Sequence, residues 1–409
     1  MDEIELKPLT IFTGANSSGK SNILEAIVIL SQIARQAPQE LTFPKHLEVG
    51  TAEFLRYPYP SIRHLVHKGD LESEIEITLH FISERSKRPI GYGIKFSSEP
   101  LSSTQTLYVN KNPICRVSHT YSKGFAFSRF VKPKIWKDKN SEQNASILLS
   151  KRVFRPQEGE SDKKKIALDK SLRTLAENIV DEIIGELSRV YWISAPRGHV
   201  PIEIRTGADP LWVGKTGENL IYMLSKIFGQ QKYKQLQNEI SSWTKKFGIG
   251  SIGAGFRKGN LLGADFQDPE LNTIIDMISA SFGSKQLLTI ITQILWSKKG
   301  DTLLIEEPEI SLHPESQVVI QELFAEAVAR GKQIICTTHS PFFILSLSKI
   351  IKKELLSKEQ IAVYHVEKKE KGTKTTMLRL DDSGFVEGWI PSYLKIENRI
   401  FEEWIEELD

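Results

Sequence analysis

The sequence contains few cysteines and no long apolar run. Cys115 and Cys336 are its only cysteines among 409 residues, so no disulfide framework is indicated and a reducing compartment is expected. The longest apolar runs, such as residues 287–296, are too short to span a bilayer. The first residues are acidic where a secretory signal would be basic. These features predict a soluble, cytoplasmic protein that does not enter a membrane.

The sequence also has little net charge, because 54 basic and 51 acidic residues leave +3. A near-neutral total neither requires nor excludes a nucleic-acid partner, since a basic stripe can be present within it. No internal repeat or sustained heptad pattern occurs, which argues against long coiled-coil arms. With 40% hydrophobic residues over 409 positions, the chain is large enough for two or three domain-sized units.

The strongest motif lies at residues 9–22, where Gly14, Gly19, Lys20 and Ser21 fit the pattern G-x-x-x-x-G-K-[ST]. An apolar strand pattern precedes the loop and helical spacing follows it, which a Gly/Ser-rich turn without function would not require. Such a loop holds phosphates with its backbone N–H groups at the positive end of a helix. The residues expected to hold a nucleotide are Gly14, Asn16, Ser17, Ser18, Gly19, Lys20, Ser21 and Asn22.

Two adjacent acidic residues, Glu306 and Glu307, follow the all-apolar residues 302–305. Such an apolar run is typical of a central parallel strand that is buried on both faces. Carboxylates at the C-terminal end of that strand lie where open α/β sheets bind ligands. One of them is expected to hold Mg²⁺ while the other orients or deprotonates water. The alternative is a solvated acidic turn, and Glu309 is expected to be such a solvated residue.

A βαβ unit is predicted from this strand through a helix at residues 315–330 to a second apolar strand at residues 333–338. The crossover should make both strands parallel in one sheet. His339 follows the second strand and is therefore expected at the same sheet edge as Glu306 and Glu307. There a histidine can contact a γ-phosphate, whereas elsewhere a lone histidine is more often structural.

A polar turn also opens an apolar helix at residues 279–294. The start of this helix is a second place where N–H groups and a helix N-terminus could meet an anion. The alternative is an ordinary capped helix, with Ser281 or Ser284 as the cap.

The remaining chain predicts an antiparallel β layer and a helical lobe. Alternating polarity at residues 74–81 indicates a half-buried strand, and similar patterns follow it. Residues 166–190 have the periodicity of one long amphipathic helix. The expected elements are strands at 74–81 and 89–96, a pair of strands within 105–117 that a turn at 110–113 separates, and helices at 166–190, 217–228 and 231–247.

These motifs resemble the ABC-type ATPase head of the overcoming-lysogenization-defect (OLD) family and of related prokaryotic AAA-type ATPases that accompany nucleases in phage defence. The segments that carry the resemblance are residues 14–21, 305–309, 311–314 and 338–341. The match covers residues 1–35 and 280–345 well, and the middle of the chain only in layout. The resemblance implies an α/β P-loop NTPase fold with an ABC-ATPase-like head, an antiparallel β layer and an inserted helical lobe. The expected divisions are residues 1–140, 141–295 and 296–409.

The resemblance also implies roles for individual residues. Lys20 takes the phosphates, Ser21 and Glu306 hold Mg²⁺, Glu307 activates water, and His339 contacts the γ-phosphate of ATP. Residues 311–314 form the loop between paired sites. The signature segment is residues 282–286, in which Gly283 and Ser284 complete the nucleotide site of a partner subunit in a homodimer. The order of Gly and Ser, and Lys285, differ from the transporter-type signature. The glutamine that usually bridges Mg²⁺ is sought near residues 63–65.

The C-terminal sequence favours an ATPase without a nuclease of its own. Family members that cut nucleic acid carry a metal-dependent nuclease domain after the switch histidine. Here the pattern predicts strands at residues 361–366 and 375–380 around a charged turn, and a last helix at residues 393–408. The sequence therefore predicts an ATP-hydrolysing subunit that dimerises around ATP and controls a separately encoded effector, a nuclease or toxin, in an antiphage system.

The alternative is a DNA-repair or chromosome-structuring ATPase that clamps DNA. Its contacts would be the basic runs at residues 132–139, 163–165 and 232–246, with Tyr233 and Trp243 interleaved in the last of them. Solvated charged faces explain these runs equally well. A transporter ATPase is disfavoured, because no segment suggests coupling to a membrane subunit.

Overall fold

The computed structural model describes residues 3–36, 74–98, 101–122, 125–131, 140–142, 170–198, 204–205, 210–257, 261–269, 271–370, 372–388 and 390. They belong to two compact units: unit 1 comprises Met1–Leu24 and Tyr191–Asp409, and unit 2 comprises Glu25–Val190. Helix α1 (Lys20–Gln36) starts in unit 1 and continues into unit 2. The division into residues 1–140, 141–295 and 296–409 stays a prediction.

The six-stranded sheet of unit 1 has the order β16-β15-β1-β14-β13-β8. Its strands are β1 (Leu9–Thr13), β8 (Val190–Ile193), β13 (Thr302–Glu306), β14 (Gln333–Thr338), β15 (Ile361–Lys369) and β16 (Gly372–Leu378). Strand β14 is parallel to both β1 and β13, as the βαβ pattern predicted. Thr13 aligns with Thr338, and Glu306 aligns with Thr337, so the three strands end at one edge. This shared edge brings distant motifs together.

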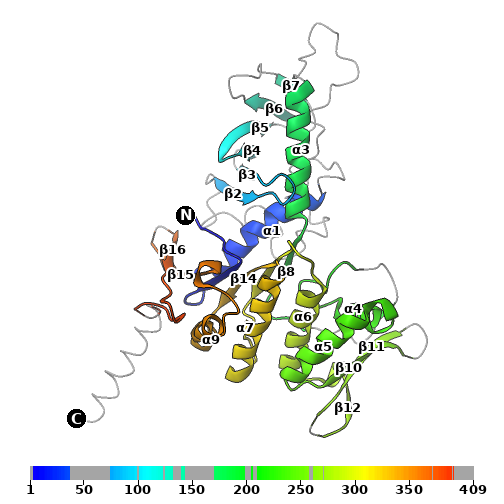
Figure 1. Ribbon diagram of the computed structural model, residues 1–409. Helices are drawn as coiled ribbons and strands as arrows, with labels where there is room; N and C mark the ends of the chain where they lie inside the picture. The colour runs from blue at the N-terminus through cyan, green and yellow to red at the C-terminus, as the bar shows by residue number, and fades with distance from the viewer. Residues whose placement is uncertain are drawn as a thin grey trace. The chain divides into compact units, whose positions relative to one another are not determined.

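Helices cover this sheet and explain its apolar central strands. All five residues of β1 are buried, as are all but the first residue of β13 and of β14. Helix α7 (Pro314–Ala329) packs against β14 and β1, and α6 (Phe282–Trp296) packs against α7, as Figure 1 shows. The short helices α8 (Pro341–Leu345) and α9 (Leu347–Lys352) also contact α7. A parallel strand covered in this way is apolar throughout its length.

Between β8 and β13 the chain forms a lobe of helices and a small antiparallel sheet. The helical elements are α4 (Leu220–Phe228), η7 (Gln231–Tyr233), α5 (Lys234–Lys246) and η8 (Met277–Ser279). The strands are β9 (Ile204–Arg205), β10 (Ser251–Phe256), β11 (Leu261–Gln267) and β12 (Ile274–Asp276). The sequence predicted the helices and not the sheet. Glycines 253, 255 and 263 lie in its two longer strands and weaken the strand pattern.

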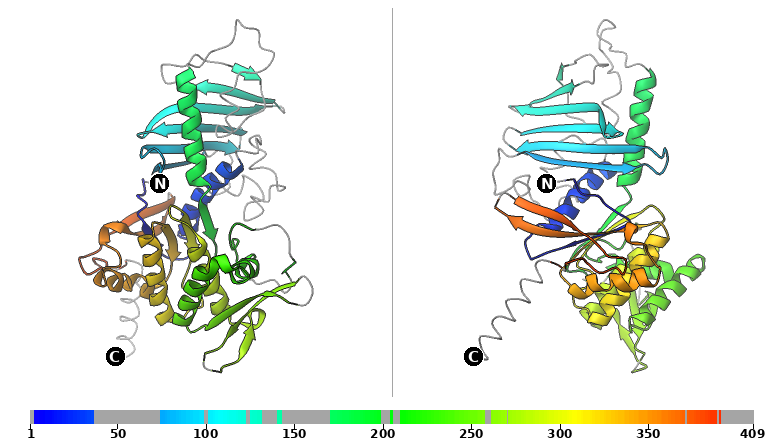
Figure 2. Two further views of the ribbon diagram at one scale, coloured as in Figure 1. Left: turned by 45° about the vertical axis from the view of Figure 1, so that its right-hand side comes forward. Right: turned by 60° about the vertical axis from the view of Figure 1, so that its left-hand side comes forward.

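Unit 2 contains an antiparallel sheet in the order β2-β3-β4-β5-β6-β7, with helix α3 (Lys170–Leu187) along one face, as Figure 2 shows. The strands are β2 (Ile75–Ile82), β3 (Pro89–Ser98), β4 (Leu101–Val109), β5 (Asn112–Ser122), β6 (Phe125–Val131) and β7 (Asn140–Glu142). Partly buried and exposed residues alternate along β2, which confirms the predicted half-buried strand. Apolar side chains of α1, α3 and strands β3 to β5 form the core of this unit.

The predicted charged turn at residues 367–374 is wrong, because most of these residues belong to β15 and β16. The two strands pair from Val363 with Leu378 to Lys369 with Gly372. Glu367 lies opposite Lys374, and a cross-strand pair of opposite charges stabilises the pairing of two strands. Residues 63–65, 132–139, 163–165 and 393–408, on which other predictions rest, lie outside the described residues. Within the described part of the chain, no helix is long and apolar enough to cross a membrane.

Candidate functional site

The phosphate loop connects β1 to α1 and has the backbone that its glycines predict. Gly14 (φ 153°) and Gly19 (φ 100°) adopt conformations that other residues rarely take. A Cβ atom at Gly14 would lie 2.2 Å from the carbonyl oxygen of Val366, and one at Gly19 would lie 2.5 Å from Oγ1 of Thr373. The β15–β16 hairpin thus packs against the loop and requires a glycine at both positions. This support could not be predicted from the sequence, because the hairpin and the loop lie at opposite ends of the chain.

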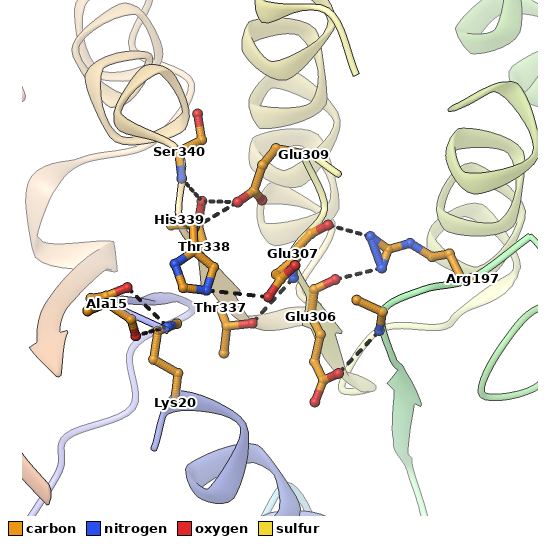
Figure 3. A network of polar contacts seen from close by, with 12 residues as sticks. Ala15, Lys20, Arg197, Glu306, Glu307, Glu309, Thr337, Thr338, His339 and Ser340 are labelled. Carbon is orange, nitrogen blue, oxygen red and sulfur yellow. Dashed lines mark hydrogen bonds and ion pairs between the residues drawn. The ribbon is translucent and has the colours of Figure 1, made fainter. Parts of the chain in front are cut away.

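Lys20 lies inside this loop, with 5% of its surface exposed. Its Nζ donates hydrogen bonds to the carbonyl oxygens of Gly14 (3.0 Å) and Ala15 (2.9 Å), as Figure 3 shows. Burial lowers the pKa of Lys20, and the charges of Glu307 and Glu309 oppose this shift. The ammonium group therefore lies within the field of the acids at the edge of β13. Other loop residues predicted to bind nucleotide are exposed, namely Asn16, Ser17, Ser21 and Asn22, whereas Ser18 is buried.

Glu306 and Glu307 point in different directions, as Figure 3 shows. Glu306 is the last residue of β13 and is 8% exposed; its Oε2 accepts a hydrogen bond from the N–H of Ala195 at 3.2 Å. Burial raises the pKa of Glu306. Glu307 has a left-handed backbone (φ 42°), and its Oε1 lies 3.4 Å from Nε2 of His339. This contact, opposed by burial, lowers the pKa of Glu307. The pKa values of these two neighbouring carboxyl groups are therefore shifted in opposite directions.

Glu309 is not the solvated residue that the sequence suggested. It is 8% exposed, and its Oε1 accepts hydrogen bonds from Oγ1 of Thr338 (2.7 Å) and from the N–H of His339 (2.8 Å). Burial raises the pKa of Glu309. The prediction failed because the turn after Glu307 folds back against the end of β14 instead of toward solvent. Glu309 thereby fixes the backbone that carries His339.

Arg197 is a site residue that the sequence reasoning missed. The Arg197 side chain is completely buried and donates hydrogen bonds to the carbonyl oxygens of Glu306 and Glu307. Burial lowers the pKa of Arg197 to about 10, and the three nearby glutamates oppose this shift. An arginine four positions after the end of β8 is the only sequence signal for it.

The donors near the loop suit Mg²⁺. This ion prefers oxygen ligands and is commonly bound by one or two protein groups together with nucleotide phosphates. The structure provides the hydroxyl of Ser21 in the first turn of α1 and the carboxylate of Glu306. Burial raises the pKa of Glu306, so its charge is costly at this position, and a bound cation would relieve that cost.

The predicted signature segment begins helix α6. Ser281 caps this helix and accepts a hydrogen bond from the N–H of Ser284 at 3.1 Å, so the alternative of a capped helix describes its local structure. A Cβ atom at Gly283 would lie 2.7 Å from the carbonyl oxygen of Ser311. The segment therefore packs on the predicted inter-site loop at residues 311–314. Phe282 beside it is 45% exposed.

The aromatic residues offered as nucleic-acid contacts have interior neighbours. The ring of Tyr233 lies 5.5 Å from that of Trp296, and Trp243 is only 6% exposed. Lys246 of the same run pairs with Glu322 at 3.0 Å. Trp243 is therefore buried in the lobe and offers no face for stacking on bases, whereas Tyr233 is only partly buried.

Comparison with known proteins identifies the class of the chain. A family profile described as an AAA ATPase domain matches residues 2–344. This match confirms the predicted α/β P-loop ATPase class. A search of curated proteins found no match.

Solved structures similar to the chain include three Smc head domains. That of Pyrococcus yayanosii, with a coiled coil and joint, is 11% identical, with 93% of this chain and 94% of that chain covered and a TM-score of 0.45. That of Pyrococcus furiosus, bound to the C-terminal domain of ScpA, is 12% identical, with 98% of this chain and 94% of that chain covered and a TM-score of 0.42. That of Thermotoga maritima is 10% identical, with 92% of this chain and 93% of that chain covered and a TM-score of 0.40.

Proposed function

Because the chain belongs to the family of AAA ATPase domains, we propose that it binds ATP with Mg²⁺ between its phosphate loop and the acidic edge of β13 and hydrolyses it there. The observation that carries this proposal is the convergence of the loop, the acids and His339 at one sheet edge, although the sequence separates them widely. The resemblance to the OLD family suggests the roles of the individual residues, and their contacts support these roles.

The phosphates are bound by the loop and by Lys20. The N–H groups of the loop and the start of α1 provide donors at the positive end of a helix. Lys20 exchanges its bonds to the carbonyl oxygens of Gly14 and Ala15 for bonds to phosphate oxygens. Ser21 and Glu306 would hold Mg²⁺, which would neutralise charge on the phosphates.

Glu307 accepts the proton of the attacking water. Its contact with His339 keeps the pKa low, so the carboxylate is ionised at neutral pH and ready to accept a hydrogen bond from water. Its left-handed backbone turns the side chain toward His339 and away from the Glu306 carboxylate. Glu309 holds the N–H of His339, which fixes the ring between Glu307 and the expected position of the γ-phosphate.

The site is completed by a second copy of the chain. Gly283 and Ser284, at the exposed start of α6, bind the nucleotide of the partner subunit, so that ATP joins two subunits head to tail. The resemblance of the motifs to the OLD family supports this arrangement, and so does the 45% exposure of Phe282 beside Gly283.

The ATP-dependent dimer controls an effector, a nuclease or toxin on a separate chain, in an antiphage system. The resemblance to ATPases that accompany nucleases supports this role. The alternative role, clamping of DNA, loses one of its suggested contacts, because Trp243 is buried in the lobe.

Mixing two variants tests the composite site. Glu307→Gln removes the base, and Ser284→Arg blocks the signature contact. Each variant alone forms dimers whose two sites are both defective. In a mixed dimer, one site combines the intact acids of one subunit with the intact signature of the other. An equimolar mixture should therefore regain about a quarter of the wild-type rate, since half of the dimers are mixed and each has one good site.

A control mixture pairs Glu307→Gln with Lys20→Ala. Both changes lie in the same half of the site, so each of the two sites in a mixed dimer carries one defect, and this mixture should stay as inactive as its components. A double variant that carries Glu307→Gln and Ser284→Arg on one chain, mixed with wild type, should supply no complete site of its own. If the first mixture stays as inactive as its components while each variant still binds ATP, the composite site is wrong.

A further inference from the structure

Arg197 combines complete burial with bonds to two successive main-chain carbonyls. Its Nη1 donates to the carbonyl oxygen of Glu306 at 2.6 Å, and its Nη2 donates to that of Glu307 at 2.5 Å. Nη1 also donates to the carbonyl oxygen of Ser194 at 3.2 Å. A buried cation is costly unless hydrogen bonds satisfy it, so its presence at this point requires an explanation.

The backbone that Arg197 holds is the one that separates the two carboxylates. Glu307 lies in the left-handed region at φ 42°, which costs an ordinary residue about 1 kcal/mol or more. The planar guanidinium bonds at once to the carbonyl oxygens of Glu306 and Glu307, which lie on either side of the Cα atom of Glu307. This fixes the peptide orientation that directs the Glu307 carboxylate to His339 and leaves the Glu306 carboxylate with Ala195.

The segment that carries Arg197 also contacts the start of α6. Gly198 has φ 83°, and a Cβ atom there would lie 2.8 Å from Cβ of Lys285 and 3.1 Å from the N atom of Gln286. The N–H of Gly198 donates to the carbonyl oxygen of Thr216 at 2.9 Å. Residues 194–198 therefore lie between the acids and the segment expected to bind the nucleotide of a partner subunit.

We infer that Arg197 is a positioning residue for hydrolysis, which sets the direction of the Glu307 carboxylate and links it to the start of α6 through Gly198. This inference rests on the proposed function, because it assumes that Glu307 is the base. Arg197 acts on the main chain of the acids and contacts no reacting atom. Its removal should therefore slow hydrolysis without weakening ATP binding.

The substitution Arg197→Lys tests this role with a change that preserves the buried charge. A lysine cannot bond both carbonyls in the planar geometry of a guanidinium. We expect kcat to fall about tenfold, since a small misplacement of a catalytic group has effects of this order or larger. The dissociation constant of ATP should stay within about threefold of wild type, because the loop is unchanged. Arg197→Met should lower kcat further.

Lys332→Met is the matched control. Lys332 is also a buried cation of unit 1 whose Nζ donates to a main-chain carbonyl, that of Ile294 at 2.5 Å, and it precedes the start of β14 at the end opposite to the acids. This variant should alter the unfolding temperature and leave kcat unchanged. If Lys332→Met slows hydrolysis as much as Arg197→Lys does, general loosening of the sheet explains both effects and the inference is wrong.

A double-mutant cycle separates positioning from mere stability. If Arg197 acts through Glu307, adding Arg197→Lys to Glu307→Gln should cause less than about a twofold further loss in single-turnover rate. The full tenfold loss on the Glu307→Gln background would overturn the inference, as would a higher ATP dissociation constant with kcat unchanged. If Glu307→Gln itself hydrolyses ATP at the wild-type rate, the proposed function fails, and this result is distinct from a failure at Arg197.

Discussion

Glu322 on α7 differs from the glutamates at the sheet edge, Glu306 and Glu309, in the groups that surround its carboxylate. Glu322 on α7 lies 3.1 Å or less from the ammonium groups of Lys246, Lys349 and Lys353. These hydrogen bonds outweigh its partial burial and lower its pKa to about 2. At the sheet edge, Glu306 and Glu309 accept hydrogen bonds from main-chain N–H groups, and burial raises the pKa of both.

The difference distinguishes a structural acid from acids arranged for chemistry. Partners that neutralise a carboxylate, as around Glu322, stabilise the fold. Neighbouring carboxylates without such compensation cost stability unless a cation or a raised pKa relieves them, and such sites are commonly functional. The comparison predicts that changes at the edge alter ATP hydrolysis, whereas changes at Glu322 alter stability.

The largest effect is expected for Glu307→Gln. Loss of the base should lower kcat by about a hundredfold or more. Because the contact with His339 lowers the pKa of Glu307, loss of its charge should also lower the unfolding temperature slightly. Steady-state phosphate release and thermal unfolding measure the two quantities. The exposed Glu354, replaced by Gln, serves as the control. A variant that is unstable but hydrolyses ATP at a normal rate per folded molecule would break the comparison.

A smaller effect is expected at Glu309, where two substitutions should behave differently. Glu309→Gln keeps an oxygen that can accept the bonds from Thr338 and His339, so kcat should stay within about threefold of wild type. Glu309→Ala leaves both donors without their acceptor and should lower kcat about tenfold through the misplaced His339. Equal rates for the two variants would show that Glu309 does not position His339.

Glu322→Gln should lower the free energy of unfolding by about 1 kcal/mol and leave hydrolysis unchanged. The effect is small because the lysine partners of Glu322 are about half exposed and water screens their charges. The pKa of Glu322 is depressed to about 2 in the folded chain. The stabilisation is therefore present above the ordinary carboxyl pKa and is lost as the pH falls toward 2. Chemical unfolding of wild type and variant between pH 7 and pH 3 should show their difference shrinking. A constant difference would contradict the ion-pair explanation.

The smallest effect is expected at Thr373, whose hydroxyl donates to the carbonyl oxygen of Ser18 at 3.0 Å. Thr373→Val keeps the shape and removes one hydrogen bond, which should weaken ATP binding about twofold to fivefold. Thr376→Val on the exposed side of β16 is the control. Calorimetric titration with ATP compares them. Unchanged binding in both variants would mean that the hairpin contacts the phosphate loop without supporting it.

The sequence predicted the elements that carry a local signal. The loop at residues 14–21 has fixed spacing, β13 and β14 each have an apolar centre at residues 303–305 and 334–336, and β2 alternates. Each of these patterns is determined by residues that are close together in the chain. The parallel sheet edge could also be anticipated, because a short crossover between two buried strands leaves few topologies.

Features that depend on distant contacts could not be predicted. Nothing near Glu309 in the sequence shows that its turn folds onto β14, and nothing near Arg197 shows that Glu306 and Glu307 will present their carbonyl oxygens to it. The support of Gly14 and Gly19 by the β15–β16 hairpin likewise joins the two ends of the chain. The small β10–β12 sheet was missed because its glycines conceal the alternation of a strand.

The central claim is that the phosphate loop and the acidic pair contact one nucleotide-bound metal ion. Iron(II) in place of Mg²⁺, with ATP and peroxide, generates radicals that cleave the backbone next to the metal, and mass spectrometry locates the cuts. The account predicts two ATP-dependent sets of cuts, one at residues 17–22 and one at residues 305–308, and loss of both in Lys20→Ala, which no longer holds the phosphates. Cuts confined to one set at saturating ATP would contradict it.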